Sequence, residues 1–247
     1  MGDLAFIIQA RLGSTRLPNK ILLPFCGQKG IFELMLDKLA GIRGADCIVA
    51  TSTAPVNDTL EAICRARNVP CYRGAEQDVL QRFIEAARRY GKTRIIRVCS
   101  DNPFLNVPAI EALIARANMS DADYIGFDVA GTPAIKTHYG FWTEYVTLAA
   151  LQKAAACTQD ALYHEHVTNY IYTHPEDFRL EWLPVPPVVL ENRHVRLTID
   201  TAQDFDAARE IYAAIADKNS FEALFRYINA RPRLVEGMVR QIANNSK

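Results

Sequence analysis

The chain alternates short apolar runs with amphipathic stretches, most regularly in its first half. The apolar runs end at polar loops, as expected for strands buried on both faces of a parallel sheet, at residues 4–10, 47–51, 69–72, 94–99 and 123–127. Apolar side chains at helical spacing predict helices between these runs, at residues 31–42, 59–67, 78–90 and 108–118. Strand–helix repeats of this kind fold as parallel β-α-β units with right-handed crossovers.

The second half of the chain is less regular. Its pattern predicts a loop and strand at 128–145, helices at 147–156, 165–173 and 202–217, strands at 178–183 and 195–199, and a helical tail at 220–247. No linker separates these segments, so we expect one domain over residues 1–247 with a small inserted lobe at residues 130–190. The predicted fold class is α/β, with a Rossmann-like, mainly parallel sheet sandwiched by helices.

Composition narrows the choice of partners. The 247 residues are 49% hydrophobic and 23% charged, which is ordinary for a globular domain with a sizeable core. Lys plus Arg and Asp plus Glu both number 28, so no bulk affinity for nucleic acid or an anionic membrane is expected. No stretch is apolar enough to cross a bilayer, and the six scattered cysteines argue against a disulfide framework or zinc site. We therefore expect a cytoplasmic protein.

A basic loop, "RLGSTRLPNK", follows the first predicted strand directly. In open parallel sheets, ligands bind at the carboxyl ends of the strands, so Arg11, Arg16 and Lys20 should face that crevice. Gly13 allows close approach of the backbone, and Ser14 offers a hydroxyl. Arginine and lysine together suit a polyphosphate, although a solvated basic turn is the alternative. Neither the Walker P-loop nor the dinucleotide-binding glycine motif is present.

Two aspartates follow predicted strands at the same edge of the sheet. Asp101 ends the fourth strand and Asp200 ends the late strand, so both carboxylates should reach one crevice. Mg²⁺ typically takes one or two protein carboxylates and completes its shell with water and substrate phosphates. Each aspartate alone also fits a turn or helix-capping role.

The pattern R-x-G-S-x-R-x-P-x-K in this loop resembles the signature loop of the cytidylyltransferases, which activate acidic sugars such as sialic acid and Kdo as CMP-sugars. The likeness is strongest to the SpsF-like spore-coat polysaccharide branch. It continues, in order, through "VATS", "YRGAEQDVLQRF", "RVCSDNPFL", "YHEHVTNYI" and "VRLTIDTAQDF". The resemblance implies a fold of the nucleotide-diphospho-sugar transferase type and a homodimer whose inserted lobe crosses to the neighbouring site.

The resemblance also implies an activity, the Mg²⁺-dependent transfer of CMP from CTP to a small acidic acceptor with release of pyrophosphate. By this likeness Arg16, Lys20 and Asp101 are catalytic, and Asp101 and Asp200 hold the metal. Asp78 is equally suited to cap the helix that follows it. The expected nucleotide-binding residues are Ala10, Arg11, Gly13, Ser14, Thr51, Ser52, Arg73, Asp78 and Ser100.

The acceptor side is defined less sharply. Candidate acceptor contacts are His138, Tyr139, Trp142, Glu144, Glu165 and His166, with Lys136 as a source of charge for an acid. Trp142 occupies a position that is acidic in the G-x-D-x-E motif of relatives, which leaves the acceptor open. Phe141, Trp142 and Tyr145 look exposed and are consistent with a dimer contact. The alternatives are another nucleoside triphosphate, a phosphonate or polyol phosphate acceptor, and a non-catalytic nucleotide-binding module.

Overall fold

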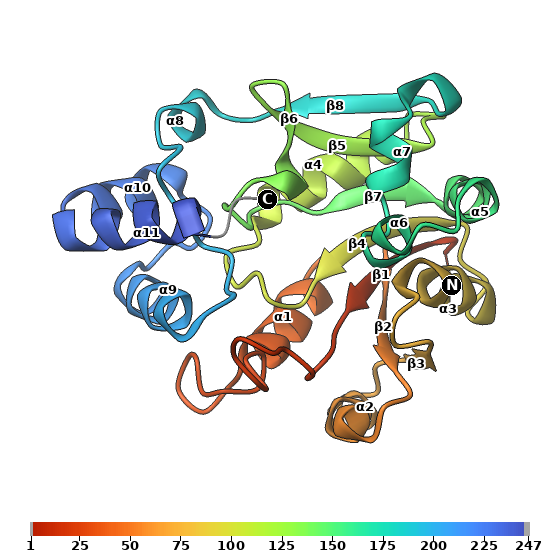
Figure 1. Cartoon of the computed structure of the whole chain (residues 1–247), viewed down its shortest axis with the longest axis horizontal. Helices are drawn as coiled ribbons and strands as arrows, with labels where there is room; N and C mark the ends of the chain where they lie inside the picture. Colours follow the sequence, from red (N-terminus) through yellow and green to blue (C-terminus); the bar gives the residue numbers. More distant parts are fainter. Residues whose placement is uncertain (1, 245–247) are drawn as a thin grey trace.

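One mixed, eight-stranded sheet organises the computed structural model, which describes residues 2–244 (Figure 1). The strands lie in the order β3 (Cys71–Gly74), β2 (Asp46–Ser52), β1 (Leu4–Gln9), β4 (Arg94–Cys99), β7 (Glu144–Thr147), β5 (Tyr124–Val129) and β6 (Thr132–Pro133), with β8 (Leu180–Pro184) paired to β5. The pairs among β1, β2, β3 and β4 are parallel, as predicted. The predicted α/β class is therefore confirmed.

Helices cover both faces of the sheet because its central strands are apolar on both sides. In β1, Leu4, Phe6 and Ile8 pack into one core, while Ala5 and Ile7 pack into the other. The first core contains apolar side chains of α1 (Ile31–Ala40) and α4 (Val107–Ala117), and the second contains those of α3 (Val79–Arg89) and α5 (Leu148–Cys157). Such continuous burial explains why the strands read as apolar runs.

The remaining elements surround this frame. They are η1 (Pro55–Asn57), α2 (Asp58–Ala66), η2 (Ala134–Lys136), α6 (Ala161–Glu165), α7 (Asn169–Thr173), η3 (Pro175–Asp177), α8 (Pro187–Leu190), α9 (Ala202–Ala214), α10 (Phe221–Asn229) and α11 (Pro232–Asn244). Among residues 2–244, no helix has the length and apolar character needed to span a membrane. The helical tail predicted at 220–247 consists of α10 and α11, and its last residues, 245–247, lie outside the described residues.

Several predictions for the second half were wrong in detail. The predicted helix 165–173 is two short helices, α6 and α7, interrupted at residues 166–168. Residues 195–199 form a buried extended segment but no strand, because the N–H groups of Leu197 and Thr198 donate to the carbonyl of His138 instead of a ladder. The helix predicted at 202–217 ends at Ala214. The inserted lobe at 130–190 stays a prediction, and its strand β7 belongs to the central sheet.

The aromatic residues expected on the surface are buried within one chain. Phe141, Trp142 and Tyr145 are 1%, 6% and 3% exposed. Phe141 and Trp142 pack edge to face, with ring centroids 5.3 Å apart, and both contact Phe221 of α10. The chain's own helix α10 packs on Phe141 and Trp142, and Arg94 lies over the ring of buried Tyr145, so these residues give no support to a dimer contact.

Candidate active site

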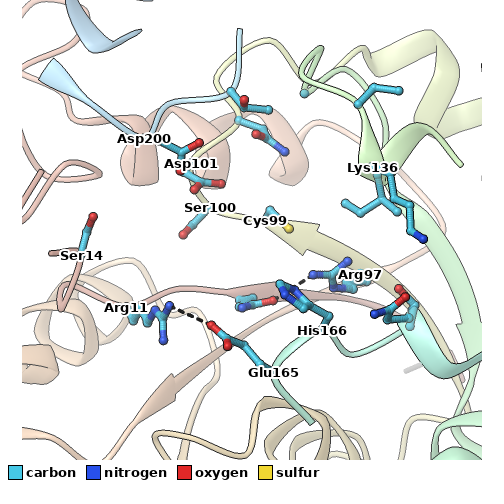
Figure 2. Close-up of a pocket in the computed structure, with 18 of the residues that line it drawn as sticks. Arg11, Ser14, Arg97, Cys99, Ser100, Asp101, Lys136, Glu165, His166 and Asp200 are labelled. Carbon is cyan, nitrogen blue, oxygen red and sulfur yellow. Dashed lines mark hydrogen bonds and ion pairs between the residues drawn. The ribbon is translucent and has the colours of Figure 1, made fainter. Parts of the chain in front are cut away.

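A cavity of about 990 Å³ opens at the carboxyl ends of β1 and β4. Its lining comes from the loop after β1, the turn after β4, the region of η2, the end of α6 and the extended segment that ends at Asp200. Figure 2 shows Asp101 and Asp200 together at one side of this space, with Arg97 and Lys136 at the other. The first basic loop and both predicted aspartates therefore share one cavity.

Two cations and two carboxylates meet at one end of the cavity. The Nζ of Lys20 lies 2.7 Å from Asp101 Oδ2 and 3.8 Å from Asp200 Oδ1. It also donates to the carbonyl of Ile199. Arg16 Nη2 lies 2.9 Å from Asp200 Oδ1. The Lys20 side chain is only 11% exposed, so its ammonium is fixed between carboxylates that arrive from two distant segments.

A buried arginine orients Asp200 from behind. Arg196 Nη2 donates to Asp200 Oδ2 at 2.7 Å, and Arg196 Nε donates to Asp204 Oδ1 at 2.8 Å. Asp204 Oδ2 accepts from the backbone N–H groups of Asp200 and Thr201 at 3.1 and 2.9 Å. Burial alone would raise the pKa of Asp204, but the hydrogen bonds and charge of Arg196, together with Thr201, hold that pKa below its ordinary value. Asp200 is thus positioned by the start of α9.

A second ion pair crosses the rim of the cavity, where Arg11 Nη2 lies 3.6 Å from Glu165 Oε1 (Figure 2). The neighbouring His164 ties the end of α6 to the rest of the molecule. Its Nδ1 lies 2.9 Å from Asp78 Oδ2, and its Nε2 is hydrogen-bonded to the Thr158 carbonyl at 3.0 Å. Burial would lower the pKa of His164, but these two partners outweigh burial and raise it.

Arg97 of β4 was not predicted as a site residue, yet it lines the cavity. Its Nη1 donates to Glu144 Oε2 at 2.6 Å, across the antiparallel register that places the two residues opposite each other. Glu144 also accepts from Tyr124 Oη at 2.6 Å and from Thr168 Oγ1 at 3.0 Å. Burial would lower the pKa of Arg97, but Cys99 and Glu144 outweigh it and keep the guanidinium protonated. The only sequence signal is an arginine inside an otherwise apolar strand.

The predicted catalytic, metal and nucleotide residues divide into two groups. Those that line the cavity are Arg11, Gly13, Ser14, Arg16, Lys20, Ser100, Asp101 and Asp200. The structure does not bring Ala10, Thr51, Ser52, Arg73 and Asp78 into this lining. Ala10, Thr51 and Ser52 are at most 1% exposed at the end of the sheet. Arg73 is held by two carboxylates of α2, and Asp78 accepts from the N–H of Gln81 as the N-cap of α3, as predicted.

The predicted acceptor contacts divide in the same way. Trp142, Glu165, His166 and Lys136 line the cavity. The other three, His138, Tyr139 and Glu144, lie behind the cavity wall, which means that they are not among the residues that line it. Their polar atoms contact buried neighbours instead. Tyr139 Oη donates to the carbonyl of Val189, His138 Nδ1 lies 2.5 Å from an Arg196 nitrogen, and Glu144 is 4% exposed beside Arg97.

The carboxylate end of the cavity fits a divalent cation whose coordination shell would be completed by substrate phosphates and water. Among residues 2–244, no cluster of three or more His, Cys, Asp or Glu side chains could hold a metal by itself. Asp101 and Asp200 nevertheless both contact the ammonium of Lys20, which shows that their oxygens converge where a positive charge already sits. Two oxygen ligands with phosphates and water are the usual surroundings of Mg²⁺.

Comparison with known proteins agrees with this geometry. A family model described as cytidylyltransferase matches residues 5–230. The spore coat polysaccharide biosynthesis protein SpsF of Bacillus subtilis (strain 168) is 31% identical over 94% of this chain and 96% of its own. A cytidylyltransferase structure from Leptospira borgpetersenii serovar Hardjo-bovis has a TM-score of 0.82 at 26% identity, covering 94% of this chain and 96% of that one. A CMP:2-keto-3-deoxy-manno-octonic acid synthetase complexed with CTP shares the fold, with a TM-score of 0.64 at 14% identity, covering 86% and 99%. The resemblance predicted from the motifs is confirmed.

Proposed function

Because the chain belongs to the cytidylyltransferase family, we propose that it transfers CMP from CTP to a small acidic acceptor, an acidic sugar or a similar acid, and releases pyrophosphate. The convergence of Arg16, Lys20, Asp101 and Asp200 at one end of the cavity carries this proposal. The product is an activated acid for polysaccharide or glycan synthesis.

The first loop holds the triphosphate. Arg16 and Lys20 supply positive charge on one side of the phosphates, and the Ser14 and Ser100 hydroxyls supply hydrogen bonds. Gly13 lines the cavity and lets the backbone approach the nucleotide closely.

The reaction is an in-line displacement at the α-phosphorus of CTP. An acceptor oxygen forms the new P–O bond, and an acceptor hydroxyl gives up its proton to water. The bond between the α-phosphorus and the bridging oxygen breaks, and that electron pair leaves with pyrophosphate. Arg16 and Lys20 stabilise the negative charge that builds on the departing group. The protein therefore contributes mainly positioning and charge neutralisation.

Asp101 and Asp200 would hold the Mg²⁺, which supplies Lewis-acid neutralisation of phosphate oxygens when bound. Arg196 and Asp204 keep Asp200 in place for this task, and Lys20 shares both carboxylates. A homodimer and a cytoplasmic location belong to the same proposal. Another nucleotide, or a phosphonate or polyol phosphate acceptor, is the alternative.

The test measures pyrophosphate release with Mg²⁺ and each of CTP, UTP, GTP and ATP, against a panel that includes Kdo and sialic acids. Lys20→Ala and Asp101→Asn should each lower release by at least about 100-fold. Their matched controls are Lys29→Ala and Asp37→Asn, because Lys29 and Asp37 form an ion pair of the same 2.7 Å length on the surface. The controls should keep full activity.

The possible results distinguish the proposed function from its alternatives. Release with CTP and one acid, lost in the two site variants alone, supports the proposal and identifies the acceptor. Release with another triphosphate would correct the nucleotide. If the protein bound no nucleotide at all, the proposed function would be wrong.

A further inference from the structure

The cations along the cavity differ in where their partners lie. Arg11, Arg16 and Lys20 each contact a carboxylate that also lines the cavity. Arg97 instead pairs with a carboxylate behind the wall, and Lys136 has no carboxylate within ion-pair distance among residues 2–244. Arg97 and Lys136 lie across the cavity from Asp101 and Asp200 (Figure 2), and in the described part of the chain neither forms an ion pair with a carboxylate that lines the cavity.

Arg97 is built into this wall more firmly than a surface arginine would be. It is 7% exposed, and its Nη1 is fixed by Glu144 at 2.6 Å. Its Nη2 makes only a long 3.3 Å contact with Gln9 Oε1, and its Nε has no hydrogen-bond partner among the described residues. A buried guanidinium with an unused donor is costly unless a ligand completes its hydrogen bonds.

Lys136 is placed to add a second positive charge beside Arg97. It ends η2, lines the same cavity, and its Nζ lies 5.1 Å from the ring centroid of Tyr172, which also lines the cavity. A cation over an aromatic face keeps its charge and its remaining donors available.

Two more atoms suggest what else the ligand carries. Asn169 Oδ1 and Thr198 Oγ1 belong to residues that line the cavity, and both lack a hydrogen-bond partner among the described residues. An amide oxygen accepts and a hydroxyl both donates and accepts, so both suit hydroxyl groups of a ligand.

We propose that Arg97, assisted by Lys136, binds an anionic oxygen group of a hydroxylated acceptor and so selects acids over their neutral counterparts. This inference rests on the proposed function and names the residues that read the acceptor's charge. Glu144 fixes the guanidinium without competing for the cavity, because it lies behind the wall. A carboxylate and a phosphate both offer anionic oxygens to Arg97, and the test distinguishes between the two groups.

The test compares the wild-type chain with Arg97→Gln, Arg97→Lys and the double variant Arg97→Gln/Glu144→Gln. Arg94→Gln is the matched control, since Arg94 lies in the same strand but donates to the carbonyl of Ala117 and to Asn118, away from this cavity. The double variant keeps the buried wall neutral if the single variant fails to fold.

Two readouts are needed. The first is pyrophosphate release with CTP and Mg²⁺, using Kdo, N-acetylneuraminate, the methyl esters of both, and ribitol 5-phosphate. The second is the thermal shift that each of these compounds produces in the presence of CTP, which requires no turnover. CTP affinity is measured separately by calorimetry.

Arg97→Gln should raise the KM of the preferred anion about 10- to 100-fold, the range expected for one lost hydrogen bond to a charged group. It should abolish the preference for the acid over its methyl ester and change CTP affinity less than twofold. Arg97→Lys should restore part of the preference, and Arg94→Gln should match wild type. Activity with a carboxylate alone or with ribitol 5-phosphate alone identifies the anionic group.

An unchanged KM and unchanged acid preference in a folded Arg97→Gln or double variant would overturn the inference. Equal losses for acid and ester would also overturn it, because that pattern indicates a packing role. Arg97-dependent binding without any turnover would support the inference and contradict the proposed function. Turnover with a KM that does not depend on Arg97 would support the proposed function and contradict the inference. Binding of none of the compounds would also overturn the inference.

Discussion

Replacing Asp204 with asparagine tests whether the buried charges behind Asp200 are coupled as the structure indicates. The Asp204 side chain is 4% exposed, and its oxygens accept from Arg196 Nε at 2.8 Å and Nη2 at 3.2 Å. Asparagine keeps the shape of the side chain but removes its charge. Arg196, 1% exposed, would then keep Asp200 as its one carboxylate partner among residues 2–244.

The size of the effect follows from this geometry. Breaking a buried pair by removing one partner costs about 3–5 kcal/mol, and the second carboxylate places this site at the lower end, about 3 kcal/mol. In a domain of this size, 1 kcal/mol shifts Tm by about 2–4 °C, so Asp204→Asn should lower Tm by about 6–12 °C at pH 7.

The deficit should depend on pH. The pKa of Asp204 is lowered in the folded chain, so its stabilising contribution is complete above its unfolded pKa, about 3.9, and is lost as the pH falls through the folded value. Urea unfolding at pH 7, 5 and 3.5 would measure the difference between wild type and variant. Asp206→Asn is the matched control, because Asp206 lies in the same helix with its side chain 67% exposed.

Two results would refute this reasoning. One is a loss below 1 kcal/mol at pH 7 in a variant that folds normally. The other is a deficit as large at pH 3.5 as at pH 7, since the lowered pKa of Asp204 requires the deficit to begin shrinking below the unfolded pKa. A control variant as unstable as Asp204→Asn would show that any change in α9 has this effect.

Three further predictions concern the cavity and its rim. His164→Gln should reduce the free energy of unfolding more at pH 6 than at pH 9, because the raised pKa of His164 gives stability below its unfolded pKa that is lost as the pH rises through the folded one; equal urea-unfolding deficits would contradict this. Gly140→Ala should cost about 1–3 kcal/mol in thermal unfolding, since Gly140 has φ +67° and a Cβ would lie 2.9 Å from Asn102 Oδ1; an unchanged Tm would contradict it. Chelation with EDTA should abolish pyrophosphate release and added Mg²⁺ should restore it, and release that survives chelation would remove the metal from the proposal.

Local patterns predicted the parallel half of the fold well. The apolar runs of β1, β2 and β4 are visible in sequence because both faces of these strands are buried. Capping signals also worked, since Asp78 caps α3 and Pro108 lies in the first turn of α4. The first loop then falls at the carboxyl end of β1 by topology alone.

Long-range pairing could not be predicted in the same way. β7 inserts antiparallel between β4 and β5, and nothing local marks that position. The predicted strand at 195–199 has an alternating pattern, but the N–H groups of Leu197 and Thr198 donate to the His138 carbonyl instead of a strand. Glu144 looked like an acceptor contact, whereas the register of β7 places it opposite Arg97 and inside the wall. These errors concern partners that are distant in sequence.

At each end of the cavity, a charged side chain that lines the cavity is held by a buried side chain of opposite charge, and the two charges are reversed between the ends. At one end, the cavity-lining carboxylate of Asp200 is held from behind by the buried guanidinium of Arg196, at the proposed site for a metal and phosphates. At the other end, the cavity-facing cation of Arg97 is backed by the buried carboxylate of Glu144. The backing group fixes the facing group while leaving its outer side to a ligand. A chain with no net charge can in this way present negative charge at one end of a cavity and positive charge at the other, which is what the proposed joining of a metal-bound triphosphate to an acid would require.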